Sequence, residues 1–288
     1  MRRNDHNEAG KPLVTFQVIT DTHVTADADH EHNRNLDRAL KDIIANSMGS
    51  SGIMHVGDLT DHGFIKEYEQ LNQIIEANKE GLPAIRFAAG NHDVAFGEWA
   101  SRLGNYTAYS GMTGAYHDHW IDGYHFIFLG TEQGLKDFCH LTQEQLEWLD
   151  MKLGEEASAD RPVFVFLHQP LMDTVAGSLQ AQGWYGVVQD SELKQVLGKH
   201  PQAIMFSGHT HWQLEAGHTM FDGRGAAATM FNAASVAYLW TDEDEHLAGS
   251  QGYYVEVFAD KVLVKGRDFA SGSWVESAQF QVDYPASR

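Results

Sequence analysis

The sequence predicts a layered α/β domain with two packed β-sheets. Up to about residue 211, short apolar runs rich in β-branched residues alternate with segments of helical periodicity. Beyond that point the pattern is mostly that of strands, which indicates a sheet completed from the C-terminal part of the chain. A chain of 288 residues is long enough to bury a substantial core in one large domain.

Apolar runs bounded by turn residues predict the strands. They are expected at residues 13–20, 53–56, 83–88, 115–121, 124–131, 162–167, 203–206, 229–236, 253–258 and 262–266. Asp122-Gly123 separates two of these runs and is typical of a two-residue hairpin turn. A second hairpin is expected around Ala259-Asp260.

Apolar residues spaced three and four apart predict the helices. They are expected at residues 34–46, 64–78, 142–152 and 190–198. Thr142 suits an N-cap, because its hydroxyl can accept a hydrogen bond from a free backbone N–H. The glycine-punctuated residues 97–114 are expected to form a loop with a short helix. Residues 1–11 are expected to be a flexible tail and residues 12–288 a single domain.

Composition limits the kinds of molecule that the protein is expected to bind and the compartment in which it is expected. The chain has 20 basic and 40 acidic residues, a formal charge of −20, so its surface should repel long nucleic acids and anionic membranes. Cys139 is the only cysteine, which excludes a disulfide within the chain and a cysteine-rich zinc site. The polar residues 1–11 lack the apolar core of a signal peptide. Together these features predict a cytoplasmic protein.

Five short blocks of metal-ligating residue types each follow an apolar run. They are Asp21-Thr22-His23, Gly57-Asp58-Leu59-Thr60-Asp61, Gly90-Asn91-His92-Asp93, His168 and Gly208-His209-Thr210-His211. Asp, Asn and His supply oxygen and nitrogen ligands for divalent metals, and open α/β sheets place their sites at the C-terminal ends of strands. Alternation along a strand would point Asp21 and His23 to one side. The glycines allow tight turns and close backbone approach.

In this order the blocks resemble the calcineurin-like metallophosphoesterase superfamily, and the likeness extends from Asp21 to His211. The resemblance implies a four-layer αββα sandwich with two packed mixed β-sheets and a centre of two metal ions. Asp58 would bridge the two ions. The other implied ligands are Asp21, His23 and His211 for the first metal, and Asn91, His168 and His209 for the second. Mixed oxygen and nitrogen ligation suits Mn, Fe, Zn or Co.

The same resemblance implies a role for a residue that is not a ligand. His92 would contact the phosphate and assist the leaving alkoxide, pointing away from Asn91 if the segment is extended. Asp61 would orient His92, because a carboxylate partner favours the charged imidazole. Asp93 is interpreted as a residue that orients its loop through hydrogen bonds from its side chain to the backbone.

The predicted reaction is hydrolysis of a P–O bond in a small phosphate ester by a metal-activated hydroxide. The helix motif at residues 141–149 is similar to the cyclic nucleotide and glycerophosphodiester phosphodiesterase branch. A phosphomonoesterase is the alternative; His62, Gly63 and Phe64 follow Asp61 where protein phosphatases carry arginine. A non-catalytic scaffold of the same fold is the other alternative, although such relatives lose ligands that this chain retains.

Several features stay open at this stage. Two aromatic pairs, Trp184-Tyr185 and Tyr238-Trp240, either cap a substrate or pack a loop. The strand-rich last third either shapes the pocket or makes a subunit contact in a homo-oligomer. His117 and His119 alternate along a predicted strand and are interpreted as exposed positions.

Overall fold

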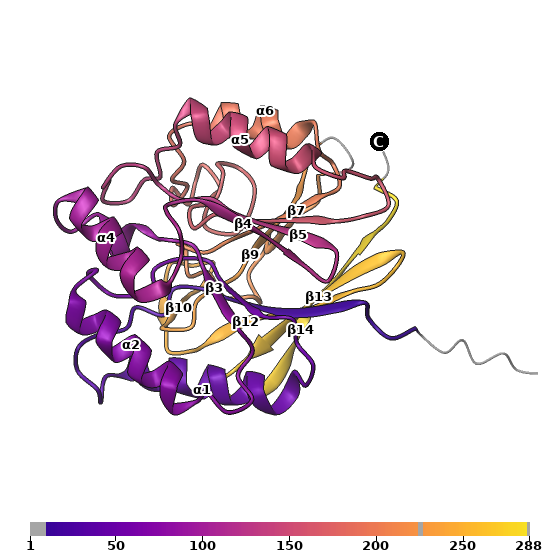
Figure 1. Cartoon of the computed structure of the whole chain (residues 1–288). Coiled ribbons are helices and arrows are strands. Elements are labelled where there is room, and N and C mark those ends of the chain that lie inside the picture. Colours follow the sequence, from indigo (N-terminus) through magenta and orange to yellow (C-terminus); the bar gives the residue numbers. More distant parts are fainter. Residues whose placement is uncertain (1–9, 224–226, 287–288) are drawn as a thin grey trace, which may run out of the picture.

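The computed structural model describes residues 10–223 and 227–286. Within these ranges the larger sheets have six strands each and pack face to face, with helices on both outer faces (Figure 1). The four-layer αββα sandwich expected from the sequence is therefore confirmed. The expected tail at residues 1–11 lies outside the described residues except for Gly10 and Lys11.

The first large sheet has the strand order β14-β13-β12-β1-β2-β3. Its strands are β1 Val14–Ile19, β2 Ile53–His55, β3 Ile85–Phe87, β12 Gln251–Val257, β13 Lys261–Asp268 and β14 Ser273–Asp283. The first three strands run parallel, whereas β12 pairs antiparallel with β1, so the C-terminal part of the chain completes a sheet begun at the N-terminus. The ends of β1, β2 and β3 consequently lie at one edge of the sandwich.

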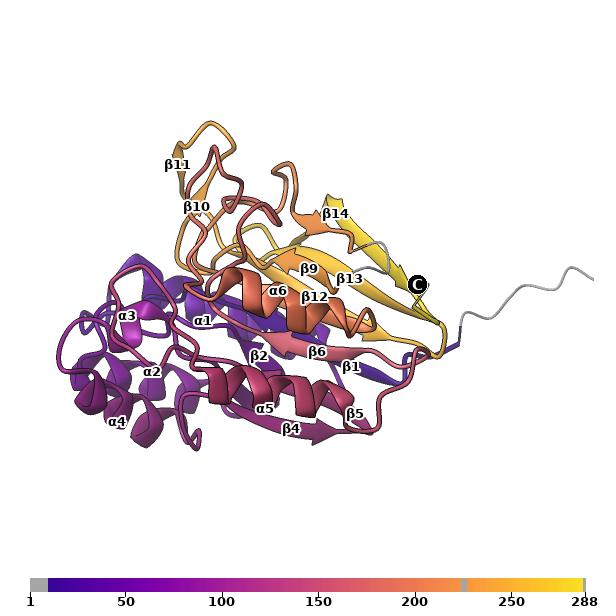
Figure 2. The ribbon, with the colours of Figure 1, turned by 90° about the horizontal axis from the view of Figure 1, so that it is seen from above.

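The second large sheet has the order β4-β5-β6-β7-β9-β8. Its strands are β4 His117–Ile121, β5 Tyr124–Phe128, β6 Val163–Phe166, β7 Ala203–Ser207, β8 Met220–Phe221 and β9 Thr229–Asn232. The predicted hairpin around Asp122-Gly123 joins β4 to β5, and β5, β6, β7 and β9 run parallel. A separate hairpin pairs β10 Leu239–Trp240 with β11 His246–Leu247, and Figure 2 shows it standing apart from both sheets.

The helices form the outer layers. Those against the first sheet are α1 Glu31–Asn46, α2 Ile65–Ala77, α3 Asn91–Val94 and α4 Trp99–Ser110; those against the second are α5 Gln143–Gly154 and α6 Asp190–Gly198. Thr142 caps α5 as predicted, its hydroxyl accepting a hydrogen bond from the Gln145 N–H at 3.2 Å. Within the described ranges, none of these helices is long and apolar enough to cross a membrane.

Three differences from the prediction have a clear physical reason or bear on the site. Helix α1 begins before residue 34, because His30 serves as its N-cap and accepts from the His32 N–H. Helix α4 is longer than the short helix expected within residues 97–114. Strand β14 was not predicted at all, since only Val275 and Ala278 along it are buried hydrophobics and its alternation is weak.

The layer between the two sheets is built from aromatic rings. Phe16 of β1 packs edge-on against Phe164 of β6, with ring centroids 4.8 Å apart. Alternation decides which layer a side chain enters: Phe164 and Phe166 face the other sheet, whereas Val163 and Val165 face α5 and α6. The continuous apolar run of β6 therefore fills two layers at once, as expected for a strand buried on both faces.

His117 is buried, contrary to the interpretation from its position in the sequence. Its Nε2 lies 2.9 Å from the Phe87 carbonyl and its Nδ1 lies 3.1 Å from His119 Nε2. Burial lowers the pKa of His117 to about 4, with the neighbouring His119 acting in the same direction and the Phe87 hydrogen bond opposing them. The folded state therefore holds His117 neutral where the unfolded chain begins to protonate it.

The free energy of unfolding is expected to fall as the pH drops from about 6.5 to about 4, because the unfolded chain binds a proton on this imidazole that the folded chain refuses. The effect of His117 is at most about 3 kcal/mol, and it is absent above pH 6.5. The measurement is the free energy of unfolding in urea as a function of pH, for wild type and His117→Gln, with EDTA present in both. The variant should show the shallower dependence, and parallel curves would contradict the assignment.

Candidate metal centre

The five ligand blocks converge at one edge of the sandwich. They follow β1, β2 and β3 of the first sheet and β6 and β7 of the second. These strands run parallel within each sheet, so their C-terminal ends lie side by side. Backbone bonds continue the pairing past the strand ends, from Asp21 N–H to the Gly57 carbonyl at 3.0 Å and from Gly208 N–H to the His168 carbonyl at 2.9 Å. The expected position of the blocks is confirmed.

The backbone at the ligands is not that of a strand, so the argument from alternation was wrong. The residues with left-handed φ include Asp21 at 52°, His23 at 41°, Asp58 at 51°, His209 at 68° and His211 at 58°. This region is uncommon for residues with a side chain and recurs at functional sites. Sharp turns beyond the strand ends, and not pleating, therefore aim these side chains at one another.

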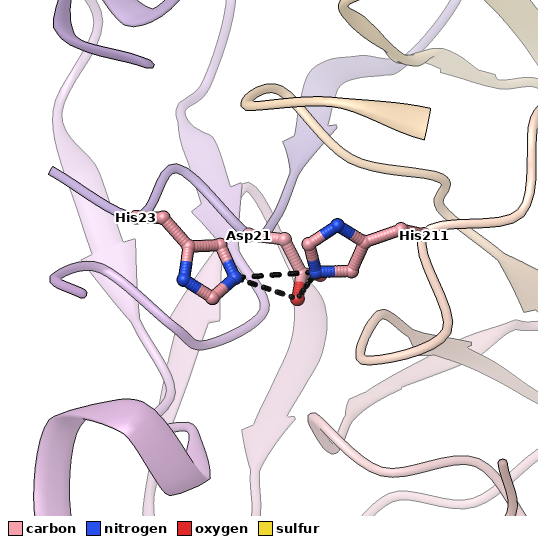
Figure 3. Close-up of side chains that lie close together, drawn as sticks. All are labelled: Asp21, His23 and His211. Carbon is pink, nitrogen blue, oxygen red and sulfur yellow. Dashed lines mark hydrogen bonds and ion pairs between the residues drawn. The ribbon is translucent and has the colours of Figure 1, made fainter. Parts of the chain in front are cut away.

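The first group of ligand atoms comes from Asp21, His23 and His211, shown in Figure 3. Asp21 Oδ1 lies 2.9 Å from His211 Nε2, and the two imidazole Nε2 atoms lie 3.2 Å apart. The other carboxylate oxygen, Oδ2, accepts hydrogen bonds from the Thr20 hydroxyl at 2.6 Å and from the His209 backbone N–H at 3.0 Å. One oxygen of Asp21 is thus fixed by the fold, and the other faces the two imidazoles.

The second group is arranged in the same way around Asp58 and His168. Asp58 Oδ1 accepts from the His92 backbone N–H at 2.8 Å, while Oδ2 lies 3.1 Å from His168 Nε2 and 3.6 Å from His23 Nε2. His168 Nδ1 lies 2.9 Å from the Val56 carbonyl and must donate to it. In a neutral ring, His168 Nε2 therefore directs a lone pair at a carboxylate.

The charges and free ligand atoms of the two groups suit a cation. Asp21 Oδ1 and His168 Nε2 are buried and make no hydrogen bond with a described residue. Burial opposes a charged imidazole, yet the nearby carboxylates of Asp21, Asp61 and Asp58 outweigh it and raise the pKa of His23 to about 10. The same carboxylates raise the pKa of His168 to about 9 against its burial. The carboxylates thus favour positive charge at this place, and the residues fit divalent metal ions.

Asn91 and His209 lie at the margin of these two groups. The Asn91 side-chain oxygen accepts from Gln169 Nε2 at 3.1 Å, and its amide nitrogen donates to the Lys136 carbonyl at 2.8 Å. The buried His209 ring lies 5.3 Å from that of His168, and burial with the nearby His168 lowers the pKa of His209 to about 3. A neutral imidazole is the form that binds a metal.

His92 and Asp61 contact each other differently from the expectation. The segment is not extended, because His92 lies in the helical turn α3. His92 Nδ1 lies 2.7 Å from the backbone carbonyl of Asp61, not from its carboxylate. The Asp61 carboxylate lies 3.3 Å from His23 Nδ1 and 3.2 Å from His62 Nδ1. Asp61 therefore holds His92 through its main chain and supports the ligand His23 through its side chain.

Asp93 joins two of the ligand loops, as the sequence interpretation held. Its carboxylate accepts from the backbone N–H of Gly90 at 2.9 Å, of Leu59 at 3.2 Å and of Thr60 at 3.1 Å. Burial and the nearby charge of Asp58 raise the pKa of Asp93 to about 6, against these hydrogen bonds. The interpretation as a loop-orienting residue is confirmed.

The sequence reading missed three supporting residues. Thr20 donates to Asp21, Gln169 donates to Asn91, and the Ser235 hydroxyl donates to the Asp21 carbonyl at 3.1 Å. Thr20 and Gln169 directly adjoin ligand positions, which is a signal that could have marked them. Ser235 is 214 residues from Asp21 in the chain, so only the fold brings the two together.

Comparisons with known proteins agree with this geometry. The model of the calcineurin-like phosphoesterase family matches residues 14–213. A protein of Synechococcus sp. named as a probable cyclic nucleotide phosphodiesterase is 31% identical over 187 residues, 64% of this chain and 68% of that protein. One of the same name from Rhodococcus erythropolis is 24% identical over 216 residues, 73% of this chain and 68% of that protein.

Solved structures show the same fold. The purple acid phosphatase PPD1 of yellow lupin (Lupinus luteus) has a TM-score of 0.67 at 15% identity, over 94% of this chain; the chain spans 53% of the lupin protein. GAP50 of Plasmodium, titled as the anchor in the inner membrane complex, has a TM-score of 0.62 at 10% identity, over 96% of this chain and 89% of that one. At these identities the likeness concerns the fold alone.

Proposed function

Because the chain belongs to the calcineurin-like phosphoesterase family, we propose that it is a phosphodiesterase that uses two metal ions to hydrolyse a P–O bond of a small phosphodiester. The proposed substrates are of the cyclic nucleotide or glycerophosphodiester type. One observation carries the proposal: buried carboxylate oxygens of Asp21 and Asp58 lie 2.9 Å and 3.1 Å from imidazole nitrogens of His211 and His168, a set of oxygen and nitrogen atoms that suits divalent metal ions. The relatives named as probable cyclic nucleotide phosphodiesterases support the choice of a diester.

The proposed ligands follow the two groups of atoms. The first ion is assigned to Asp21, His23 and His211, whose ligand atoms already converge. The second would be held by His168 with Asn91 and His209, which lie at the margin of the groups, and Asp58 would contribute its carboxylate to the centre. When bound, divalent ions of this kind neutralise charge on a phosphate group and activate water as a nucleophile. Manganese, iron and zinc all suit the oxygen and nitrogen ligands.

His92 is proposed as the group that contacts the phosphate and gives a proton to the leaving alkoxide. Its ring lies 4.5 Å from that of His23, so it borders the first group of ligands. The Asp61 carbonyl fixes the ring through Nδ1, while Nε2 makes no hydrogen bond with a described residue. The atom available to substrate is therefore Nε2, which a general acid needs within hydrogen-bond reach of the leaving oxygen.

A diester is favoured over a monoester by the charges near the site. A phosphate monoester carries more negative charge than a diester, and extra cationic side chains would help to hold it. Arg102 is close in the fold, but its guanidinium donates to the Gly63 carbonyl at 2.7 Å and lies over the Phe64 ring at 4.7 Å. Arg86 lies within β3, before the ligand block. These contacts engage the Arg102 guanidinium away from the ligand blocks, and Arg86 does not belong to one of them.

The test compares kcat/KM for bis(p-nitrophenyl) phosphate and p-nitrophenyl phosphate after loading with Mn²⁺. We expect the diester to be the better substrate and chelation by EDTA to remove both activities. A preference for the monoester would overturn the phosphodiesterase proposal in favour of a phosphatase. Metal-replete protein without activity on either compound would overturn the assignment as an esterase.

A further inference from the structure

A wall of flat rings stands beside the first group of ligands. We call His32, Tyr238, Trp240 and His246 the aromatic wall. The Tyr238 ring lies 4.4 Å from that of His211 and 6.0 Å from that of His23. The centroid of the His32 ring lies 5.6 Å from that of Tyr238, with an angle of 31° between the ring planes. For His246 the distance is 5.2 Å and the angle is 30°. The Trp240 ring meets that of Tyr238 edge-on, at 6.4 Å and 79°. Tyr238 is thus the centre of a cluster of tilted and edge-on rings beside the first group.

The backbone fixes Tyr238 relative to these ligands. On one side, the Ala237 N–H donates to the Asp21 carbonyl at 3.0 Å. On the other side, the Trp240 N–H donates to the His211 carbonyl at 2.9 Å. Two hydrogen bonds to the main chain of two ligand residues therefore bracket Tyr238, so that its ring keeps a set position above the first group.

The aromatic wall is mostly built from residues beyond the match to the family model. The family match ends at residue 213, whereas Tyr238, Trp240 and His246 come from the β10–β11 hairpin and the residue before it. This hairpin stands apart from the two large sheets in Figure 2. Because the wall borders the first group of ligand-type residues, it is suited to choosing among substrates.

The chemistry of the wall fits a planar, uncharged group. Tyr238 is half-buried and its hydroxyl makes no hydrogen bond with a described residue, while the His246 side chain is exposed. The turn beside the wall, residues 242–245, is entirely acidic and would repel a second phosphate. Aromatic rings bind nucleobases by stacking on their faces, whatever the base.

We propose that the aromatic wall, centred on Tyr238, binds the planar group of the substrate diester, a nucleobase in a natural substrate. This proposal rests on the phosphodiesterase function and selects nucleoside phosphodiesters over glycerophosphodiesters. Tyr238 is then a residue that determines specificity through binding, and its loss acts on KM for substrates that carry a base.

The test measures kcat and KM of the Mn²⁺-loaded enzyme on 3′,5′-cyclic AMP, glycerophosphoethanolamine and glycerophosphocholine. Tyr238→Leu is expected to raise KM for the cyclic nucleotide about tenfold or more, and to change KM for the two glycerophosphodiesters by less than about twofold. Tyr238→Phe keeps the ring and should stay close to wild type. Trp120→Leu is the matched control, because Trp120 is an exposed ring that pairs with His125 at the opposite end of the sheet.

A second readout does not depend on catalysis. Calorimetry with adenosine, which carries no phosphate, should detect binding to wild type and Tyr238→Phe and weaker binding to Tyr238→Leu. Adenosine binding that depends on Tyr238 in a protein without diesterase activity would support the wall and overturn the proposed function. If the enzyme is a diesterase but Tyr238→Leu changes KM equally for all substrates, nucleobase binding by the wall is contradicted and the phosphodiesterase function stands. An effect on KM confined to glycerophosphocholine would contradict it too, because it would indicate a site for a cation.

Metal content is measured for each variant, since Tyr238 packs against His211. If Tyr238→Leu fails to fold, His246→Ala carries the test, because that side chain is exposed and its ring lies 5.2 Å from that of Tyr238. It should raise KM for the cyclic nucleotide a few-fold and leave the glycerophosphodiesters unchanged. An unchanged KM for the cyclic nucleotide in every variant, with unchanged adenosine binding, contradicts the proposal.

Discussion

An Asp58→Asn variant is expected to lose tight metal binding and nearly all phosphodiesterase activity. Asp58 Oδ2 lies between His168 Nε2 and His23 Nε2, the position from which one carboxylate can serve two ions. An amide removes the negative charge that holds the cations. Loss of a residue that only hydrogen-bonds to a metal ligand lowers metal affinity by up to ~100-fold. Loss of the Asp58 charge should lower it by more. Losing several kcal/mol of metal assistance should lower kcat/KM at least about a thousandfold.

Metal content by mass spectrometry, circular dichroism and kcat/KM check this expectation together. Asp118→Asn is the matched control, because Asp118 belongs to another acid and histidine group, with His125 and Glu155, far along the second sheet. The control should keep two ions per chain and full activity. An Asp58→Asn protein that folds, retains both ions and hydrolyses diesters normally would contradict the central place given to Asp58.

His92→Ala is expected to lower kcat by about 10²- to 10⁴-fold and to leave metal content unchanged. The reason is geometric: Nδ1 is engaged by the Asp61 carbonyl, and Nε2 is the nitrogen left to give a proton to the leaving group. The loss should be larger for a diester with an alkyl leaving group than for bis(p-nitrophenyl) phosphate, because p-nitrophenolate departs without a proton. Comparing kcat on these two substrates isolates the proton-donor role.

The control for this variant is His62→Ala, an exposed imidazole beside the same loop, which should change kcat by less than about tenfold. Loss of metal from His92→Ala would reassign His92 as a ligand. His92 could take that role, because its ring lies close to His23 and Asp61. Equal losses on both leaving groups would instead indicate that His92 positions the phosphate and transfers no proton.

Much of the fold could be predicted, because short stretches of the sequence carry the apolar runs, the helical spacing and the capping residues of its elements. Strand β6 is a continuous apolar run, and α5 has both its apolar spacing and the Thr142 cap. Strand β14 could not be found in this way. It lies at the edge of its sheet with mostly exposed residues and is held by backbone pairing to β13, which leaves little hydrophobic signal in the sequence.

The ligand-type residues could also be named from the sequence, but not their orientation. Alternation places Asp21 and His23 on one side of a strand, whereas both lie beyond the strand in left-handed backbone. The contact of His92 with the Asp61 carbonyl, and of the Asp61 carboxylate with His23, depends on how two loops meet. Distances between loops that are far apart in the chain are set by packing of the whole sandwich, which no local pattern reports.

On the proposed assignment of the ligands, the left-handed backbone at the centre would also tie the lifetime of the protein to its metal supply. Five ligand-type residues, Asp21, His23, Asp58, His209 and His211, each hold a conformation that costs roughly 1 kcal/mol or more. Their sum approaches the roughly 5–15 kcal/mol by which a folded domain outweighs its unfolded chain. Ions that bind only the folded state offset this cost. A cell short of metal would therefore hold a protein whose catalytic edge opens first to proteases, and abundance would decline together with activity.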